Sequence, residues 1–398
     1  MSCLDVDALL DDRRTGIIVC CGSGGVGKTT TSAALALRAA ERGRTVVVLT
    51  IDPARRLAQS MGIEALDNTP RPVAGVVSTS STGAGRLDAM TLDMKRTFDE
   101  VVESQASPEK ARQILQNPFY VALSSSFAGT QEYMAMEKLG QIHRDAHYDL
   151  IVVDTPPSRS ALDFLDAPER LSSFLDGRFI RLLLAPARGP ARLMTAGLSL
   201  VTNALTKVLG AQVLRDMQTF VAAFDTLFGG FRQRAQQTFE LLQADGTAFL
   251  VVAAPEPDAM REAAYFVERL SDDGMPLAGL VVNRAGTAPA GEVSAEEALV
   301  AAARLRRSRS GSLTAGLLRL HADQLRRVER EGQLRRRFAA AHPRVATTVV
   351  PALAGDVHDV DGLRRIGALL GGGGGGPEKK SRKNPPPKKN EKKKTTPP

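Results

Sequence analysis

The sequence predicts an α/β fold in which a mostly parallel β-sheet is flanked by helices and interrupted by an inserted α-helical subdomain. Short apolar runs rich in β-branched residues alternate with longer stretches of helical periodicity, which is typical of parallel sheets covered on both faces. A glycine-rich loop follows the first run, and one long central region has helical periodicity without a strand. The predicted strands are residues 16–21, 45–51, 150–153, 249–253, 277–282 and 346–350.

The first strand leads into a phosphate-binding loop. Residues 22–29 read Gly-Ser-Gly-Gly-Val-Gly-Lys-Thr, which satisfies G-x-x-x-x-G-K-[ST], and a helical run from Thr30 to Glu41 follows. Glycines allow successive backbone N–H groups to surround an anion at a helix N-terminus. Lys28 then places a cation on the β and γ phosphates, and the Thr29 hydroxyl can bind Mg²⁺. The pattern predicts a P-loop site for a nucleoside triphosphate and magnesium.

A dinucleotide site is the rival interpretation of the same loop. Gly22, Gly24 and Gly27 match G-x-G-x-x-G, and the acidic residue Asp52 ends the next strand. A pyrophosphate-binding turn has no use for a lysine at position 28, so the Lys28-Thr29 pair favours the P-loop.

Two acidic residues follow predicted strands and complete the expected site. Asp154 ends the strand 150–153, where a carboxylate can hold Mg²⁺ through the metal's water shell. Asp52 follows the strand 45–51, where it can orient the attacking water. The alternative for Asp52 is a capping role before Pro53 at the first turn of a helix.

The remaining segments give the domain organisation. Residues 1–15 are expected to be an N-terminal extension, residues 16–370 the ATP-binding domain, and about 161–245 its helical subdomain. Two one-sided apolar stripes between residues 194 and 231 predict either helices packed as core or an exposed groove for an apolar client. The sequence cannot separate these two interpretations.

The C-terminal tail accounts for most of the net charge of +8. Residues 371–398 contain eight lysines, one arginine and two glutamates, twelve glycines or prolines, and no aliphatic or aromatic side chain. Such a segment cannot bury enough apolar surface to fold, so disorder is predicted. Because the rest of the chain is nearly neutral, nucleic-acid binding is not expected.

Compartment and redox state follow from the N-terminus and the cysteines. The first fourteen residues include four aspartates and lack a basic segment followed by an apolar one, and no run of 18 apolar residues occurs. The adjacent Cys20 and Cys21 point to opposite faces of a strand, which favours buried thiols over a disulfide. A cytoplasmic protein is expected.

Several ordered motifs resemble the deviant-Walker-A ATPases, and among them the arsenical-pump and tail-anchored-protein targeting ATPases. Gly22–Thr30 resembles GKGGVGKTT, Asp52–Ala54 the first switch segment, and Asp154–Ser160 the second. Later matches are Phe127–Glu132, Ala254–Glu256, Val282–Arg284 and Val350-Pro351 followed by Asp356-Val357.

The resemblance implies a dimeric Mg-ATPase that closes over ATP or ADP and moves a helical subdomain. Lys28 and Asp52 would be catalytic, and Thr29 and Asp154 would hold the metal. Asn283 would contact the base. The predicted nucleotide-binding residues are Gly22, Gly24, Gly25, Val26, Gly27, Lys28, Thr29, Thr30, Asn283 and Pro351.

Departures from the family pattern bear on mechanism. Ser23 stands where the family has a signature lysine that reaches into the partner's site, so a heterodimer with a lysine-bearing paralogue, or slow hydrolysis, is expected. Arg55 and Arg159 replace usual family residues and are interpreted as surface positions, although either could restore a positive charge. No Cys-x-x-Cys zinc motif occurs, and Arg306–Ser310 occupies that stretch.

The expected function is therefore a cytoplasmic Mg-ATPase that couples hydrolysis to a helical region binding a client or a membrane-protein partner, in transport or targeting. Two alternatives stay open: a positional ATPase of the ParA/MinD type, and a non-hydrolysing regulatory subunit of a heteromeric ATPase. The polar C-terminus disfavours a membrane-binding helix of the positional type.

Overall fold

The computed structural model describes most of the 398-residue chain. The described residues are 2–52, 54–77, 85–126, 130–156, 230, 233–289, 291–306 and 312–372. Most of the expected helical subdomain, with its two apolar stripes, and nearly all of the basic tail lie outside these ranges. Of the expected subdomain, residues 233–243 are described and helical.

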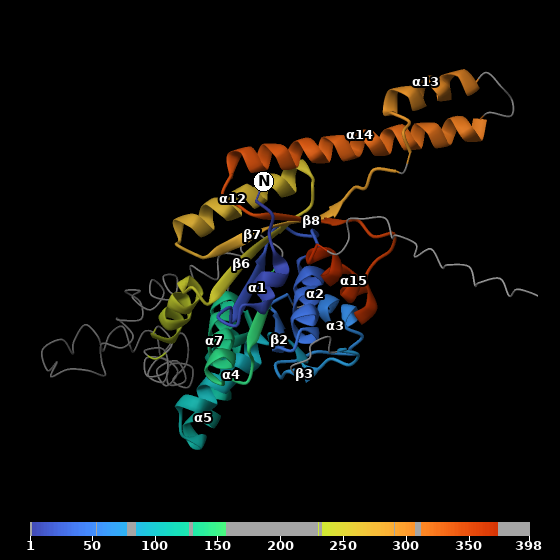
Figure 1. The fold of residues 1–398 in the computed structure, drawn as a ribbon. Coiled ribbons are helices and arrows are strands. Elements are labelled where there is room, and N and C mark those ends of the chain that lie inside the picture. Colours follow the sequence, from blue (N-terminus) through green and yellow to red (C-terminus); the bar gives the residue numbers. More distant parts are fainter. Residues whose placement is uncertain are drawn as a thin grey trace, which may run out of the picture.

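Among the described residues, one eight-stranded sheet forms the centre of the fold, in the order β3-β4-β2-β5-β1-β6-β7-β8 (Figure 1). All pairs are parallel except the edge pair β3–β4. Six of the strands are those that the sequence predicts, with ends that differ by at most three residues: β1 Ile17–Cys21, β2 Thr45–Thr50, β5 Leu150–Asp154, β6 Thr247–Ala253, β7 Leu277–Ala285 and β8 Thr347–Pro351.

Two strands at one edge of the sheet were missed by the sequence analysis. They are β3 Arg71–Pro72 and β4 Arg86–Thr91. β4 contains a fully buried acid, Asp88, which the pattern of apolar residues does not favour in a strand. Its carboxylate accepts hydrogen bonds from Arg86 and from the Tyr148 hydroxyl, and these partners offset the cost of burial.

Helices cover both faces of the sheet and bury two separate cores. One core contains Ile18, Cys20 and Val48 and is covered by α1 Val6–Asp11, α2 Lys28–Glu41, α3 Arg56–Ser60 and α15 Val360–Leu370. The other contains Val19, Cys21 and Leu49. It is covered mainly by α4 Met94–Gln105, α5 Pro108–Leu115, α6 Pro118–Ser126, α7 Thr130–Arg144 and α12 Pro257–Asp272.

The cysteines of β1 follow this alternation, as predicted. Cys20 and Cys21 are buried free thiols on opposite faces of the sheet, and Cys3 is exposed and free. Burial raises the pKa of the Cys20 thiol to about 12 and that of Cys21 further, so both stay protonated.

The N-terminal residues pack onto the domain through one buried arginine. Arg44, which precedes β2, is 1% exposed, and its guanidinium donates to the carbonyls of Leu10, Asp12, Thr15 and Asp149. On the surface nearby, Asp7 and Asp11 of α1 pair with Arg38 of α2 and with Arg42, which follows that helix.

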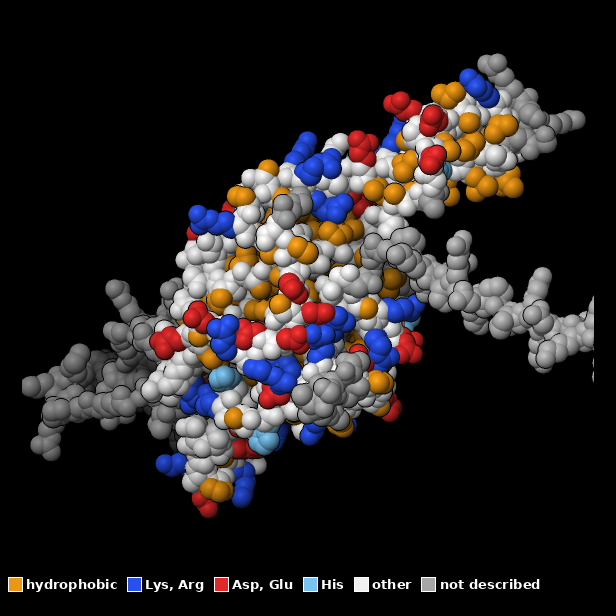
Figure 2. Space-filling view, in the orientation of Figure 1, with side chains coloured by type: hydrophobic (Ala, Val, Ile, Leu, Met, Phe, Trp, Pro, Cys, Tyr) orange, Lys and Arg blue, Asp and Glu red, His pale blue; other side chains and the backbone are white. Residues whose placement is uncertain are grey.

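A helical hairpin projects away from the sheet (Figure 1). It consists of α13 Ala295–Leu305, which packs along the distal part of the long helix α14 Ser312–Ala341. Figure 2 shows hydrophobic side chains gathered on this hairpin, where Leu313, Leu317 and Leu320 are 75%, 58% and 66% exposed. No helix in the described part of the chain combines the length and apolar character that crossing a bilayer requires.

Candidate nucleotide-binding site

The glycine-rich loop lies where β1 ends and α2 begins. Gly22 and Gly27 have φ angles of 144° and 93°, in the region that favours glycine. A Cβ on Gly22 would lie 2.1 Å from the carbonyl oxygen of Val252, and one on Gly27 would lie 2.3 Å from the Asn283 amide nitrogen. The loop therefore requires glycine at both positions. The helix α2 begins at Lys28, two residues before the predicted start at Thr30. The backbone N–H groups of its first turn have no partner within the helix, and they face the loop.

Lys28 is buried at the base of this loop. Its ammonium group donates hydrogen bonds to the carbonyl oxygens of Gly22 at 3.0 Å and Ser23 at 2.9 Å. Burial lowers the pKa of Lys28, while the charge of Asp154 opposes that shift. The amine is thus held inside the loop, at the position where the sequence predicts contact with the phosphates.

Thr29, Thr50 and Asp154 form a hydrogen-bonded group beside Lys28. One carboxylate oxygen of Asp154 accepts from the Thr29 hydroxyl at 2.8 Å and from the Thr50 hydroxyl at 2.9 Å. The other oxygen, Oδ1, is buried and has no hydrogen-bond partner among the described residues. Burial raises the pKa of Asp154 to about 6, although the two hydroxyl donors favour its ionised form.

Asp52 lies after β2, the strand that pairs with β5 in the sheet. Its Oδ1 accepts from the backbone N–H of Ala54 at 3.0 Å, and its Oδ2 lies 3.8 Å from the guanidinium of Arg56. The N-cap of α3 is Arg55, so Asp52 does not cap this helix as the alternative interpretation proposed. Asp52 instead holds the turn that precedes the helix.

Asn283 and Arg284 approach the loop from the end of β7. The Asn283 side-chain amide donates to the carbonyl of Val26 at 2.8 Å, and the Arg284 guanidinium donates to the carbonyl of Gly25 at 2.9 Å. Arg284 has a φ of 58°, which is uncommon for a residue other than glycine. The strand end is thus fixed directly to the phosphate loop.

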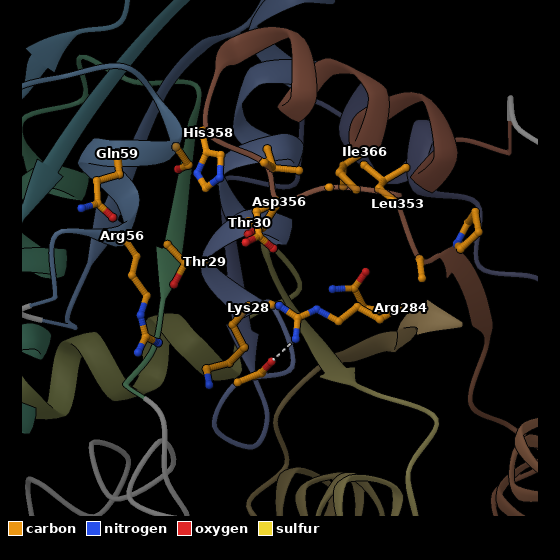
Figure 3. Close-up of a pocket in the computed structure, with 18 of the residues that line it drawn as sticks. Lys28, Thr29, Thr30, Arg56, Gln59, Arg284, Leu353, Asp356, His358 and Ile366 are labelled. Atoms are coloured by element: carbon orange, nitrogen blue, oxygen red, sulfur yellow. Dashed lines mark hydrogen bonds between the residues drawn. The ribbon is translucent and has the colours of Figure 1, made fainter. Parts of the chain in front are cut away.

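These segments surround a cavity of about 830 Å³ (Figure 3). Its walls come from the loop, from α3, from the end of β7 and from the segment after β8. Most predicted site residues line it: Gly25, Gly27, Lys28, Thr29, Thr30, Asp52, Asn283 and Pro351. Gly22, Gly24 and Val26 belong to the loop but do not line the cavity, and Asp154 lies behind Thr29.

Three arginines that the sequence analysis did not assign to the site also line the cavity, namely Arg56, Arg284 and Arg327. Arg55, which the sequence raised as a source of charge, is exposed and does not line it. Arg159 lies outside the described residues. The sequence contained a sign that Arg56 could belong to the site, because Arg56 lies four residues after Asp52. Spacing alone, however, does not say which of the adjacent residues Arg55 and Arg56 faces the cavity.

The donor set fits a magnesium ion bound with a phosphate. A threonine hydroxyl and a carboxylate with one unpartnered oxygen lie together beside a lysine, and Mg²⁺ prefers such oxygen ligands completed by water and phosphate. The described residues contain no cluster of three or more His, Cys, Asp or Glu that could hold a metal by themselves.

Comparison with known proteins identifies the family. The sequence profile of the anion-transporting ATPases, the ArsA ATPase family, matches residues 15–298. The chain belongs to this family. The resemblance expected from the loop and the two strand-end aspartates is therefore confirmed, as is the α/β fold.

Individual relatives within the ArsA ATPase family are distant in sequence. An ATPase ASNA1 homolog of Cryptosporidium parvum is 27% identical over 66% of this chain and 63% of its own length. An ATPase GET3 of Malassezia globosa is 29% identical over 42% of this chain and 46% of its own. A Halobacterium salinarum protein named as an arsenical pump-driving ATPase is 27% identical over 46% of this chain and 29% of its own length. The chain thus spans less than two thirds of the length of these relatives.

Proposed function

We propose that this protein is a Mg-dependent ATPase that hydrolyses ATP to ADP and phosphate. The observation that supports this most is the convergence of Lys28, Thr29, Asp52 and Asp154 around one glycine-lined cavity, in a chain of the ArsA ATPase family. A dinucleotide site does not explain a buried lysine within the loop or a threonine bonded to a strand-end carboxylate.

Each residue has a role that its position supports. The loop N–H groups and Lys28 bind the phosphates and stabilise the charge that spreads over the γ-phosphoryl oxygens in the transition state. Asp52 orients a water molecule toward the γ phosphorus. The water oxygen bonds to that phosphorus while the bond from the phosphorus to the bridging oxygen breaks, and ADP leaves with the electron pair. One proton of the water stays on the phosphate and the other is released to solvent.

Thr29 and Asp154 would hold the magnesium ion. Because the Thr29 hydroxyl donates its hydrogen to Asp154, its oxygen lone pairs remain available for the metal, and Asp154 would act through metal-bound water. When bound, Mg²⁺ neutralises charge on the β and γ phosphates. Asn283 and Pro351, on the wall opposite the switch segments, are proposed to contact the base and its surroundings.

We also propose a dimer, formed by two copies or with a related subunit. Arg327 of α14 lines the cavity, and Leu320 and Leu313 lie seven and fourteen residues before it, on the same face of the helix. A subunit that closed over the nucleotide would cover these exposed leucines. The uncharged side chain of Ser23 makes a homodimer less suited to fast hydrolysis than a pair with a lysine-bearing subunit.

The proposed cellular role is transport or targeting in the cytoplasm, in which the protein binds an apolar client or a membrane-protein partner. Arsenite is a poor candidate ligand, because two of the chain's three thiols are buried and protonated, which leaves the exposed Cys3 as a single accessible thiol. The helical region expected to bind the client lies mostly outside the described residues.

Steady-state ATP hydrolysis tests this proposal. We expect Mg-dependent release of phosphate that falls at least about a hundredfold in Lys28→Ala and Asp52→Asn. The exposed variant Asp258→Asn is the matched control and should retain the wild-type rate. Nucleotide binding without hydrolysis would favour the regulatory-subunit alternative, whereas hydrolysis unchanged in both variants would place the site elsewhere.

A further inference from the structure

The phosphate end of the cavity has more negative than positive groups. Asp52 and Asp154 both lie there, and a bound ATP would add the charges of its γ phosphate. Lys28 supplies one positive charge. Ser23, the second residue of the loop, is buried with its hydroxyl unpartnered among the described residues and contributes no charge. Besides the magnesium ion that would arrive with the nucleotide, a further cationic side chain at this end would stabilise the charge of a phosphoryl-transfer transition state.

Two of the three arginines that line the cavity are held by other groups. The guanidinium of Arg284 donates to the carbonyl of Gly25 at 2.9 Å. The guanidinium of Arg327 donates to Glu331 at 2.8 Å, and Glu331 in turn accepts from the backbone N–H of Gly286. Neither side chain can turn to the phosphates without giving up these bonds.

Arg56 is different, because its only ion pair in the described part of the chain is long. The guanidinium lies 3.8 Å from Asp52 Oδ2, beyond hydrogen-bond distance, and the side chain is 61% exposed. In Figure 3 this side chain extends from α3 toward the part of the cavity where the Lys28 side chain ends. The exposed side chain has room to move toward a phosphate while staying near Asp52.

We propose that Arg56 contacts the terminal phosphate of bound ATP from within the same subunit, and so supplies a second cationic side chain to the active site beside Lys28. This inference rests on the proposed function. It assigns a catalytic role to the first residue of α3, four residues after Asp52. Because ADP lacks the γ phosphate, Arg56 also becomes the residue that distinguishes ATP from ADP.

A positioning role through Asp52 is the competing explanation, and binding measurements separate the two. If Arg56 acted only by orienting Asp52, its removal would have no effect once Asp52 had lost its charge. If Arg56 contacts phosphate directly, its removal weakens binding of a triphosphate in the Asp52→Asn background as well.

The experiment is calorimetric titration of the full chain with Mg²⁺ and either ADP or a non-hydrolysable ATP analogue with an imido β–γ bridge. Arg56→Gln should weaken the binding of the ATP analogue by about tenfold or more, which is the effect expected from the loss of one charge-assisted hydrogen bond. The same substitution should weaken the binding of ADP by less than about twofold. Arg56→Lys should give an intermediate loss. The adjacent, exposed Arg55→Gln is the matched control and should leave both affinities within about twofold.

Three results would overturn the inference: Arg56→Gln binding the analogue as well as the wild type does, an equal loss for both nucleotides, or an effect that disappears in Asp52→Asn. Arg56 is exposed, so its replacement should leave the thermal midpoint unchanged, and a loss of stability would likewise count against a specific contact. A wild-type chain that binds neither nucleotide overturns the proposed function and this inference together. Normal wild-type binding with an unaffected Arg56→Gln overturns this inference alone.

Discussion

The hydroxyl of Thr29 donates a 2.8 Å hydrogen bond to the carboxylate of Asp154, which joins the first turn of α2 to the carboxyl end of β5. β5 lies directly beside β1 in the sheet, so the strand that precedes the phosphate loop and the strand that presents the acid are neighbours. Ligand sites in open parallel sheets form at the carboxyl ends of such strands. This single contact therefore places the proposed phosphate and metal groups within reach of one another.

Asp154→Asn should stabilise the protein in the absence of nucleotide while abolishing its Mg-dependent function. Burial raises the folded-state pKa of Asp154 to about 6 from 3.8 in an unfolded chain, so the folded state favours the protonated carboxyl. Its contribution to stability is complete below pH 3.8 and is lost as the pH rises through 6. At pH 8 the ionised group costs on the order of 3 kcal/mol, which asparagine would remove.

Urea unfolding of both proteins in EDTA between pH 4 and pH 8 measures this effect. The stability difference should be small near pH 4 and should grow through pH 6. Asp258→Asn, on the exposed surface of α12, should show no such trend. An Asp154→Asn variant less stable than the wild type at pH 8 would show that the ionised carboxylate is satisfied in the free protein.

Two glycines of the loop should respond differently to alanine. Gly22→Ala introduces a Cβ 2.1 Å from the Val252 carbonyl oxygen at a φ of 144°, and should lower the free energy of unfolding by about 3 kcal/mol or more. Gly25→Ala has a φ of 76° but meets no atom within 4 Å, and should cost about 1 kcal/mol. Denaturant unfolding measures both, and equal losses would contradict the packing assigned to Gly22.

Arg44→Met should destabilise the domain by about 3 kcal/mol, because it leaves the buried carbonyls of Leu10 and Thr15 without their donor. Arg42→Met is the matched control, since Arg42 makes only partly exposed ion pairs with α1 and its loss should cost less than about 1 kcal/mol. Thermal unfolding of both variants is the measurement. A mild effect at Arg44 would mean that the N-terminal residues contribute little to the domain.

The exposed leucines of α14 should be needed for the proposed dimer. We expect the wild-type chain with Mg²⁺ and a non-hydrolysable ATP analogue to sediment as a dimer, and the triple variant Leu313→Ser, Leu317→Ser, Leu320→Ser as a monomer. Tyr265→Ser, at an exposed aromatic on α12, is the control and should remain dimeric. A triple variant that stays dimeric would show that another surface forms the contact.

The sequence predicted the parts of the fold whose pattern is local. The strands around Val19, Val47 and Val152 are continuous β-branched runs, and the loop from Gly22 to Thr29 has a spacing that few other structures share. These segments also hold most of the candidate site. Parallel pairing then brings strand ends together, so Asp154 could be assigned to the site from its position after a strand.

Features that depend on contacts between distant segments were not predictable. β4 contains Asp88, and one of the two groups that offset its burial, the Tyr148 hydroxyl, donates to it from 60 residues away. Arg44 is a single arginine among many, and only the folded chain shows the carbonyls that surround it. Choosing Arg56 over Arg55 likewise required the direction in which each side chain leaves α3.

Calorimetric titration of the wild-type chain with ATP, in the presence and absence of Mg²⁺, tests the central claim most directly. We predict that ATP binds with micromolar or tighter affinity in Mg²⁺, that Lys28→Ala abolishes this binding, and that NADH does not compete. Equal ATP binding with and without Mg²⁺ in the wild type, or tighter binding of NADH than of ATP, would contradict the account.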